Sequence, residues 1–374
     1  MNRSTLVVVG VVGVVVLAAV ASGLQGALGS HGATPAPDVA AAPPASTATA
    51  TSDDTIPVGD IRRLPKPKPG DLHGALAVWS TGDCLPVAMD LDRLLSTSPG
   101  AMRSACAAWI SPDGRWMALV PYHAQEVYAA PAIADRGVGT GLRYTQFDPP
   151  QVTVADDGSV ASCDATRVRL ARGGKLTTVR SFFVSEAVND ERCTTGAIGT
   201  SVVRLSDDRG RLVDVVSGRT VRRLPRPAPP TVVAIAASSD GYVAVADTAD
   251  GPASATVYAP SGRVATARRR IGPAGVVGEL TVARGGTAVA LGTANGWTVT
   301  NLESGRTLTS PGGSLVLDVA FSPDGDTLAA ATLTGLVFAR VADLAPRWFL
   351  DFPSQAIGWF PAGLFPDTRT APIG

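Results

Sequence analysis

Residue types that commonly perform chemistry are sparse in this chain of 374 residues. The four cysteines and three histidines are Cys84, Cys106, Cys163, Cys193, His31, His73 and His123. The cysteines form no Cys-x-x-Cys pair, and their spacings match no zinc module. Two histidines lie in or beside a linker, so His123 stands alone and cannot build a metal site. No Ser-His-Asp set is evident, and the sequence predicts no catalytic residue, no metal site and no cofactor.

The composition excludes two broad classes of protein. The 32 Lys and Arg residues balance 32 Asp and Glu, which argues against a nucleic-acid binder with its basic face. Charged residues make up only 17% of the chain and hydrophobic residues 45%, which argues against general disorder. With 40 Gly, 29 Pro and few Lys or Glu, the chain is expected to consist of strands and turns.

The N-terminus predicts the compartment. The uncharged apolar stretch 5–28 is about 24 residues long, and about 20 suffice to cross a bilayer. Arg3 precedes it and the next positive charge is Arg62, so residues 1–4 are expected in the cytoplasm and the rest outside. We therefore predict a transmembrane signal anchor. A cleaved signal peptide is the alternative, because Ala19-Val20-Ala21 fits a signal-peptidase site, and the product would then be secreted.

Residues 29–70 are predicted to form a disordered linker. They are rich in Ala, Pro and Thr, as in the run 40–51, and show no apolar periodicity that could build a core. Such a Pro-rich segment is semi-extended, at about 3.1 Å per residue. The basic run 62–68 is expected to be the solvated end of this linker.

The remaining chain repeats with a period of about 42 residues. Turn signals recur at Asp113-Gly114, Asp157-Gly158, Asp240-Gly241, Gly285-Gly286 and Asp324-Gly325. The interval between 158 and 241 is twice the others, which predicts a degenerate turn near residue 199. A second marker, Ser-Gly-Arg, recurs independently at residues 217, 261 and 304. Repeats of this length indicate a stacked or radial architecture.

Each repeat is predicted to contain four short strands. The apolar strand 315–321 leads into a Ser-Pro-Asp-Gly turn, and the small-residue strand 327–332 follows. Proline presets the turn's φ angle, glycine allows positive φ, and aspartate can bond the backbone two residues on. A third strand, a Ser-Gly-Arg turn and a fourth strand complete the unit. Four strands in 40 to 45 residues are typical of a β-propeller blade.

The count of repeats predicts an all-β, seven-bladed propeller over residues 71–366, followed by a tail, 367–374. Six turns give six blades. Residues 75–90 resemble a third and fourth strand with nothing before them, and 355–363 a first strand with nothing after it. The N- and C-terminal strands are therefore expected to share one blade. That blade should bury large apolar residues of the last strand: Ile357, Trp359 and Phe360.

These repeats resemble a known family. The segments 319–329 with 335–338, and 109–118, are similar to WD-type repeats, closest to bacterial Tol-type periplasmic propellers with Ser-Pro-Asp-Gly turns. The resemblance covers roughly residues 75–360. The Gly-His and Trp-Asp dipeptides that name the WD family are absent. The resemblance implies the propeller fold and says little about function.

Outside the cytoplasm, an even number of cysteines predicts two disulfides. The blade register places Cys163 at the end of a second strand and Cys193 in the loop leaving the same blade. We predict that these two pair, which leaves Cys84 to pair with Cys106. Four buried free thiols are the alternative.

The leading functional hypothesis is a non-enzymatic binding or scaffold module of the cell envelope. Its partner would be an envelope protein, a peptide or a glycan. Enzymatic propellers usually gather acids and histidines at the central channel, and here glutamate is scarce. Asp318 lies within a first strand, where we expect it to bond a neighbouring loop. The alternative is a secreted lactonase- or lyase-like enzyme with its site at the channel mouth.

Overall fold

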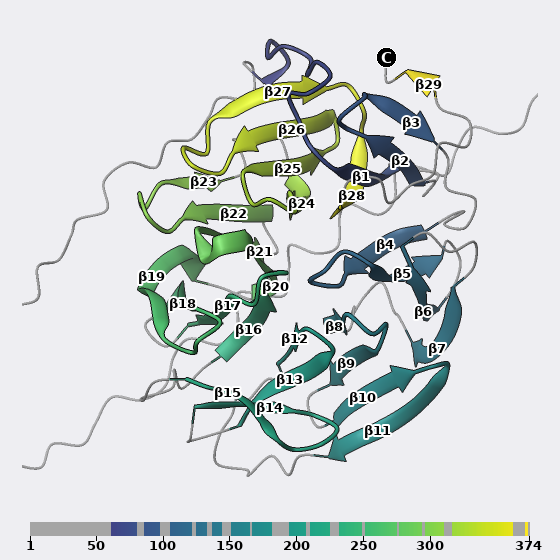
Figure 1. The fold of residues 1–374 in the computed structure, drawn as a ribbon, viewed down its shortest axis with the longest axis vertical. Coiled ribbons are helices and arrows are strands. Elements are labelled where there is room, and N and C mark those ends of the chain that lie inside the picture. The colour runs from purple at the N-terminus through teal and green to yellow at the C-terminus, as the bar shows by residue number, and fades with distance from the viewer. Residues whose placement is uncertain are drawn as a thin grey trace, which may run out of the picture. The chain divides into compact units, whose positions relative to one another are not determined.

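A computed structural model describes most of the chain beyond residue 60. The described residues are 61–80, 86–97, 105–121, 125–132, 137–143, 151–164, 167–181, 194–206, 210–224, 232–248, 251–274, 277–293, 296–309, 316–361 and 371–372. They form seven antiparallel sheets, each of which is one blade of a propeller (Figure 1).

Six blades are meanders of four strands whose spatial order follows the chain. Blade 1 contains β4 (Ala105–Ile110), β5 (Trp116–Pro121), β6 (Glu126–Pro131) and β7 (Val138–Arg143). Blade 2 contains β8 (Gln151–Val154), β9 (Val160–Asp164), β10 (Arg167–Arg172) and β11 (Lys175–Ser181). Blade 3 contains β12 (Thr195–Ile198), β13 (Ser201–Ser206), β14 (Arg211–Asp214) and β15 (Thr220–Arg223).

The other blades follow the same plan, with one exception. Blade 4 contains β16 (Val232–Ala237), β17 (Val243–Asp247), β18 (Pro252–Tyr258) and β19 (Val264–Ala274). Blade 5 contains β20 (Val277–Val282), β21 (Ala288–Thr293), β22 (Gly296–Asn301) and β23 (Thr307–Thr309), with a short 3-10 helix, Arg284–Gly286. Blade 6 contains β24 (Val316–Phe321), β25 (Thr327–Thr332), β26 (Gly335–Arg340) and β27 (Pro346–Leu350). Blade 7 contains β1 (Ala75–Ser80), β2 (Pro86–Asp90), β3 (Leu95–Thr97), β28 (Ser354–Phe360) and β29 (Ala371–Pro372).

The first strands of the blades form a closed ring. Each contacts the first strand of the next blade, in the order β4, β8, β12, β16, β20, β24 and β28, and β28 contacts β4 again. The repeat analysis is confirmed on this point, including the degenerate turn at Gly199, which joins β12 to β13. The seven inner strands enclose the central channel that is a general feature of propellers.

Blade 7 joins the two ends of the propeller. Its strand order is β28-β1-β2-β3-β29, and the pairing of β1 with β28 sets Ala75 opposite Phe360 and Leu76 opposite Trp359. Figure 1 shows yellow β28 beside dark blue β1. The prediction that the terminal strands share one blade is therefore confirmed. The prediction that residues 75–90 supply its third and fourth strands is wrong, because β28 is the first strand of the blade and β1 and β2 are the second and third. Two residues of the segment predicted as a tail, Ala371–Pro372, pair with β3.

Apolar side chains fill the space between blade 7 and its neighbours. Ile357 and Trp359 are buried in one cluster with Phe338 of blade 6. Phe360 is fully buried in another cluster, with Met117 of blade 1. The last strand thus contributes to the packing on both sides of its blade.

The end of the predicted linker is folded onto blade 6. Ile61 is buried among apolar residues of blades 5 and 6, and Pro67 is also buried. The carbonyl oxygen of Pro65 accepts a hydrogen bond of 3.1 Å from the backbone nitrogen of Phe349 in β27. This hydrogen bond pairs a backbone group of the outermost strand of blade 6, which makes that edge less available for pairing with a strand of another molecule.

Several sequence predictions fall outside the described residues. These are the apolar stretch 5–28, the linker up to residue 60, Cys84 and Cys193; Cys106 lies in β4, but its side chain is not described. Within the residues that are described, no helix is long and apolar enough to cross a membrane.

Candidate functional site

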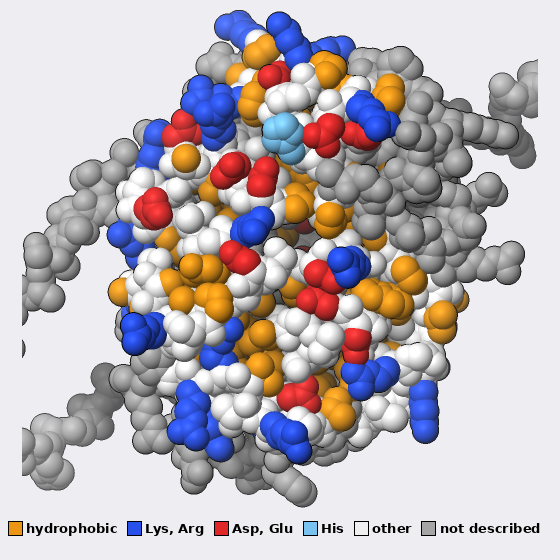
Figure 2. Space-filling model, in the orientation of Figure 1, with side chains coloured by type: hydrophobic (Ala, Val, Ile, Leu, Met, Phe, Trp, Pro, Cys, Tyr) orange, Lys and Arg blue, Asp and Glu red, His pale blue; other side chains and the backbone are white. Residues whose placement is uncertain are grey.

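One face of the ring carries the recurrent turns. Strands alternate in direction, so the turn from first to second strand and the turn from third to fourth strand emerge on the same side. We call this side the turn face. Its inner turns join β4–β5, β8–β9, β12–β13, β16–β17, β20–β21 and β24–β25. Acidic and basic side chains are interspersed over it (Figure 2).

The Asp-Gly pairs of the sequence repeat close these inner turns. In blade 6 the Ser322 hydroxyl donates to Asp324 and accepts from the backbone nitrogen of Thr327 at 2.9 Å. Gly325 follows with φ +84°, a value that L side chains rarely adopt. The same arrangement recurs with Asp113-Gly114 in blade 1 and Asp240-Gly241 in blade 4. The turn aspartates thus hold their own loops in shape.

Carboxylates also tie the turns of blades 1 and 2, and those of blades 4 and 5, to each other. Asp156 accepts a hydrogen bond of 3.0 Å from the backbone nitrogen of Asp113. Asp240 accepts one of 2.9 Å from the backbone nitrogen of Gly285. Loss of hydration and the nearby charge of Asp113 raise the pKa of Asp156 to about 6. The turns therefore form a mutually braced platform rather than independent loops.

Asp157 and Gly158 have a related structural role in blade 2. Asp157 accepts from the backbone nitrogen of Ser159 at 3.0 Å and pairs with Arg172 on β10. Gly158 has φ +78°, and a β-carbon added there would lie 2.5 Å from the Trp116 ring of blade 1. This turn needs glycine both for its backbone angle and for close packing against its neighbour.

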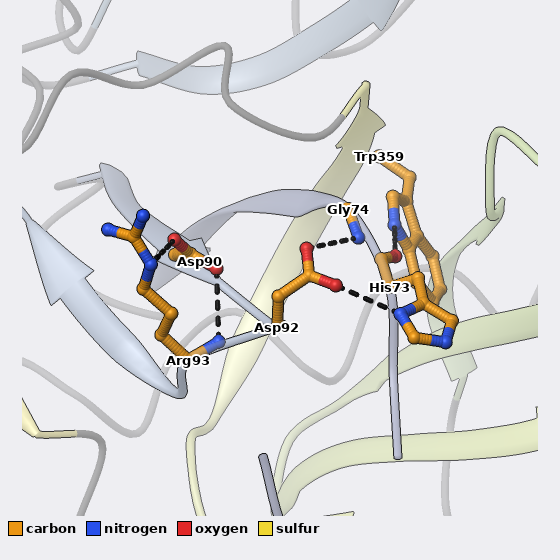
Figure 3. A network of polar contacts seen from close by, with 6 residues as sticks. All are labelled: His73, Gly74, Asp90, Asp92, Arg93 and Trp359. Atoms are coloured by element: carbon orange, nitrogen blue, oxygen red, sulfur yellow. Dashed lines mark hydrogen bonds and ion pairs between the residues drawn. The ribbon is translucent and has the colours of Figure 1, made fainter. Parts of the chain in front are cut away.

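A network of hydrogen bonds connects the residues just before β1 to β28 (Figure 3). His73 Nδ1 donates to Asp92 Oδ1 at 2.9 Å, and Gly74 N donates to Asp92 Oδ2 at 3.1 Å. Trp359 Nε1 donates to the His73 carbonyl at 3.0 Å. The hydrogen bond to Asp92 raises the pKa of His73, and the negative charge of Asp92 adds to this effect. His73, which was expected beside the linker, lies just before β1, where this strand meets β28.

Two acids lie on neighbouring inner strands. Asp318 of β24 accepts backbone hydrogen bonds from Val319 at 2.8 Å and from Ile357 of β28 at 2.9 Å. The expected structural role of Asp318 is seen, except that it bonds a neighbouring strand rather than a loop. Burial and the charge of Glu279 on β20 raise the pKa of Asp318 well above its usual value. Asp318 is therefore harder to ionise than an ordinary aspartate.

Glu279 combines crowding with exposure to solvent. Loss of hydration raises its pKa to about 7, yet its side chain remains exposed. Because the side chain stays exposed, solvent screening reduces the effect of this shift on stability.

Replacing Glu279 with Gln is expected to stabilise the protein at neutral and alkaline pH and to have no effect in acid. The folded-state pKa of about 7 lies above the ordinary glutamate value of 4.5, so wild-type stability falls as pH rises between these values. Melting temperatures of wild type and E279Q should therefore coincide at pH 4, and the variant should melt higher at pH 8. Equal melting temperatures at both pH values would show that Glu279 is fully hydrated.

Cys163 lies at the end of β9, the second strand of blade 2, as the register predicted. The described part of the chain contains no free cysteine. Cys84, Cys106 and Cys193 have no described side chains, so the two pairings remain predictions.

The described residues contain no group of three or more His, Cys, Asp or Glu side chains that could hold a metal ion. Comparison with protein-family models finds no match, and comparison with characterised proteins finds none either. Among solved structures, the chain is similar to the β-propeller domain of Cps50 (Swd1) from Myceliophteria thermophila, at 14% identity and a TM-score of 0.43. That match covers 69% of this chain and 90% of the other. The propeller assignment itself rests on the sheet topology.

Proposed function

We propose that this propeller is a non-enzymatic binding or scaffold module, tethered to the cell membrane by residues 5–28 and held on its outer side. The observation that carries the proposal is the braced turn face. The carboxylates of Asp113, Asp156 and Asp240 accept hydrogen bonds from backbone nitrogens of their own turn or of a neighbouring turn. Such a surface suits recognition by shape and charge, because its loops are already ordered before a partner arrives.

The partner is expected to be an envelope protein, a peptide or a glycan. Arg115 is exposed on an inner turn of blade 1 and offers a cation to such a ligand. Leu333 lies in the turn between β25 and β26, which emerges on the opposite side of the ring. These two positions allow the faces to be compared in one experiment.

Photo-crosslinking in native cells tests this function. A photoreactive residue in place of Arg115 should give a discrete adduct with an envelope component, and one in place of Leu333 should give none. Protease added to intact spheroplasts should digest everything beyond about residue 30. Adducts from both positions alike, or full protection from protease, would contradict the proposal.

Asp318 and Glu279, on neighbouring inner strands, support a second candidate function, that of a secreted lactonase- or lyase-like enzyme. Strongly shifted pKa values often mark catalytic groups, and Glu279 has a pKa near neutrality. If the binding function is correct, a broad screen of lactonase and lyase substrates is expected to detect no turnover. Turnover that E279Q abolishes, in a protein that still folds, would favour the enzyme instead.

A further inference from the structure

Arginines accumulate on the outer strands of blades 3 and 4, in a chain whose net charge is zero. β15 is the outermost strand of blade 3 and β19 the outermost strand of blade 4. Besides Arg268, which pairs with Asp247, five arginines on these strands and the turns before them are exposed: Arg219, Arg223, Arg263, Arg269 and Arg270. We refer to these five residues as the arginine edge.

The arginine edge lacks the counter-charges found elsewhere on the molecule. On other blades, Arg347 pairs with Asp343 at 2.7 Å and Arg172 pairs with Asp157. Within the described residues, none of the five arginines of the edge forms an ion pair. Their positive charge is therefore available to a ligand.

Two described acids of the same blades are already engaged. Asp214, at the end of β14, accepts hydrogen bonds from the backbone nitrogen of Ser217 at 2.7 Å and from its hydroxyl at 2.8 Å. Asp247 of β17 is fully buried and pairs with Arg268 at 2.6 Å. Neither carboxylate is placed to neutralise the five exposed guanidinium groups.

Exposed aliphatic side chains lie among these arginines. Val216, Val221 and Val264 are 56%, 39% and 44% exposed, on the same turn and the same two strands. Arginine set among exposed apolar side chains is typical of protein–protein interfaces.

The two outer strands form one continuous surface. A β-carbon added at Gly262, in the turn before β19, would lie 3.6 Å from the carbonyl oxygen of Arg223 in β15. Arg222 of β15 also donates to the carbonyl oxygen of Gly241 in blade 4 at 2.9 Å. A ligand can therefore contact both blades at once.

We propose that the arginine edge docks an acidic segment of a partner protein that also carries aliphatic side chains. Guanidinium groups match carboxylates in bidentate pairs, and the valines receive the apolar side chains of the segment. The pairing of β18 with β19 shifts register three times, and such irregularity disfavours addition of a further strand. Recognition is thus by side chains. Arg219 and Arg263 lie in outer turns of the turn face, so the proposal rests on the binding function proposed above and names the chemistry of its partner. Its test uses purified protein and peptides, so it can fail while crosslinking in cells succeeds.

Selection from a displayed library of random 12-residue peptides tests this proposal. Wild-type protein is the target, and R219E/R223E/R263E is used for counter-selection. Selected peptides should be rich in Asp and Glu with interspersed aliphatic residues. Their affinity should fall about tenfold or more in the charge-reversal variant and decrease with added salt. The matched control R143E/K175E/R340E, on other blades, should bind within about twofold of wild type.

A second comparison separates a protein segment from other polyanions. V221S/V264S should weaken binding of the selected peptide and leave binding of inorganic polyphosphate and of anionic phospholipid vesicles unchanged. If the charge-reversal variant does not melt cooperatively, R219Q/R223Q/R263Q replaces it. Failure to enrich acidic peptides, or peptide binding that ignores both the arginine and the valine changes, would overturn the proposal. Tighter binding of polyphosphate or vesicles than of any peptide would overturn it as well.

Discussion

Deletion of residues 355–374 is expected to yield a protein that unfolds or aggregates. The deletion removes β28 almost entirely, so β1 loses one of its two partner strands and the ring opens between blades 6 and 1. Three large buried side chains are lost, at about 1.5–3 kcal/mol each. Their sum of roughly 5–9 kcal/mol is comparable with the whole stability of a typical domain, about 5–15 kcal/mol. Circular dichroism melting and size-exclusion chromatography would measure the effect.

The matched control is deletion of residues 33–55, which lie within the predicted linker. This shorter chain should melt cooperatively within a degree or so of the full-length protein. A C-terminally truncated protein that melts at the full-length temperature would show that β28 does not close the ring.

Replacement of Trp359 with Ala is expected to destabilise the fold by about 3–5 kcal/mol, the usual cost of removing a buried tryptophan. Three contributions disappear together. The ring is buried, its centroid lies 6.0 Å from that of Phe338 in an edge-to-face arrangement, and its Nε1 donates to the His73 carbonyl. Urea unfolding monitored by circular dichroism would give the free energy.

Trp359→Phe separates these contributions. Phenylalanine keeps most of the apolar contact and loses the hydrogen bond, so about 1–2 kcal/mol of the loss should remain. If both variants lose the same stability, the hydrogen bond to His73 rather than the packing holds blade 7 closed.

The sequence determined the ring well because the repeat is local. Each Asp-Gly turn identifies itself by residue type, and the intervals between the turns count the blades. Even the degenerate turn at Gly199 could be located by interpolation. The split blade followed from half-repeats at each end, with Trp359 and Phe360 correctly expected to be buried.

Contacts between blades were much harder to foresee. Asp156 precedes the repeat's own Asp157, and nothing in its type or spacing shows that it bonds the turn of another blade. The environment of Glu279 could not be foreseen from its type or spacing either. It was noticed only as one of few glutamates, since its shifted pKa depends on which strands surround it. The folded linker end was missed because a single buried Ile61 produces no periodicity.

The pairing of Ala75 with Phe360 has a consequence for the order in which the blades can follow one another along the chain. These residues lie opposite each other at the ends of β1 and β28, as the two arms of an ordinary hairpin do. A short connection from Phe360 to Ala75 would make blade 7 a continuous meander, and the chain could then begin in the loop before any other blade. Circular permutants opened between blades should therefore reach the same ring. The fold itself therefore allows the chain to begin before any of the other six blades.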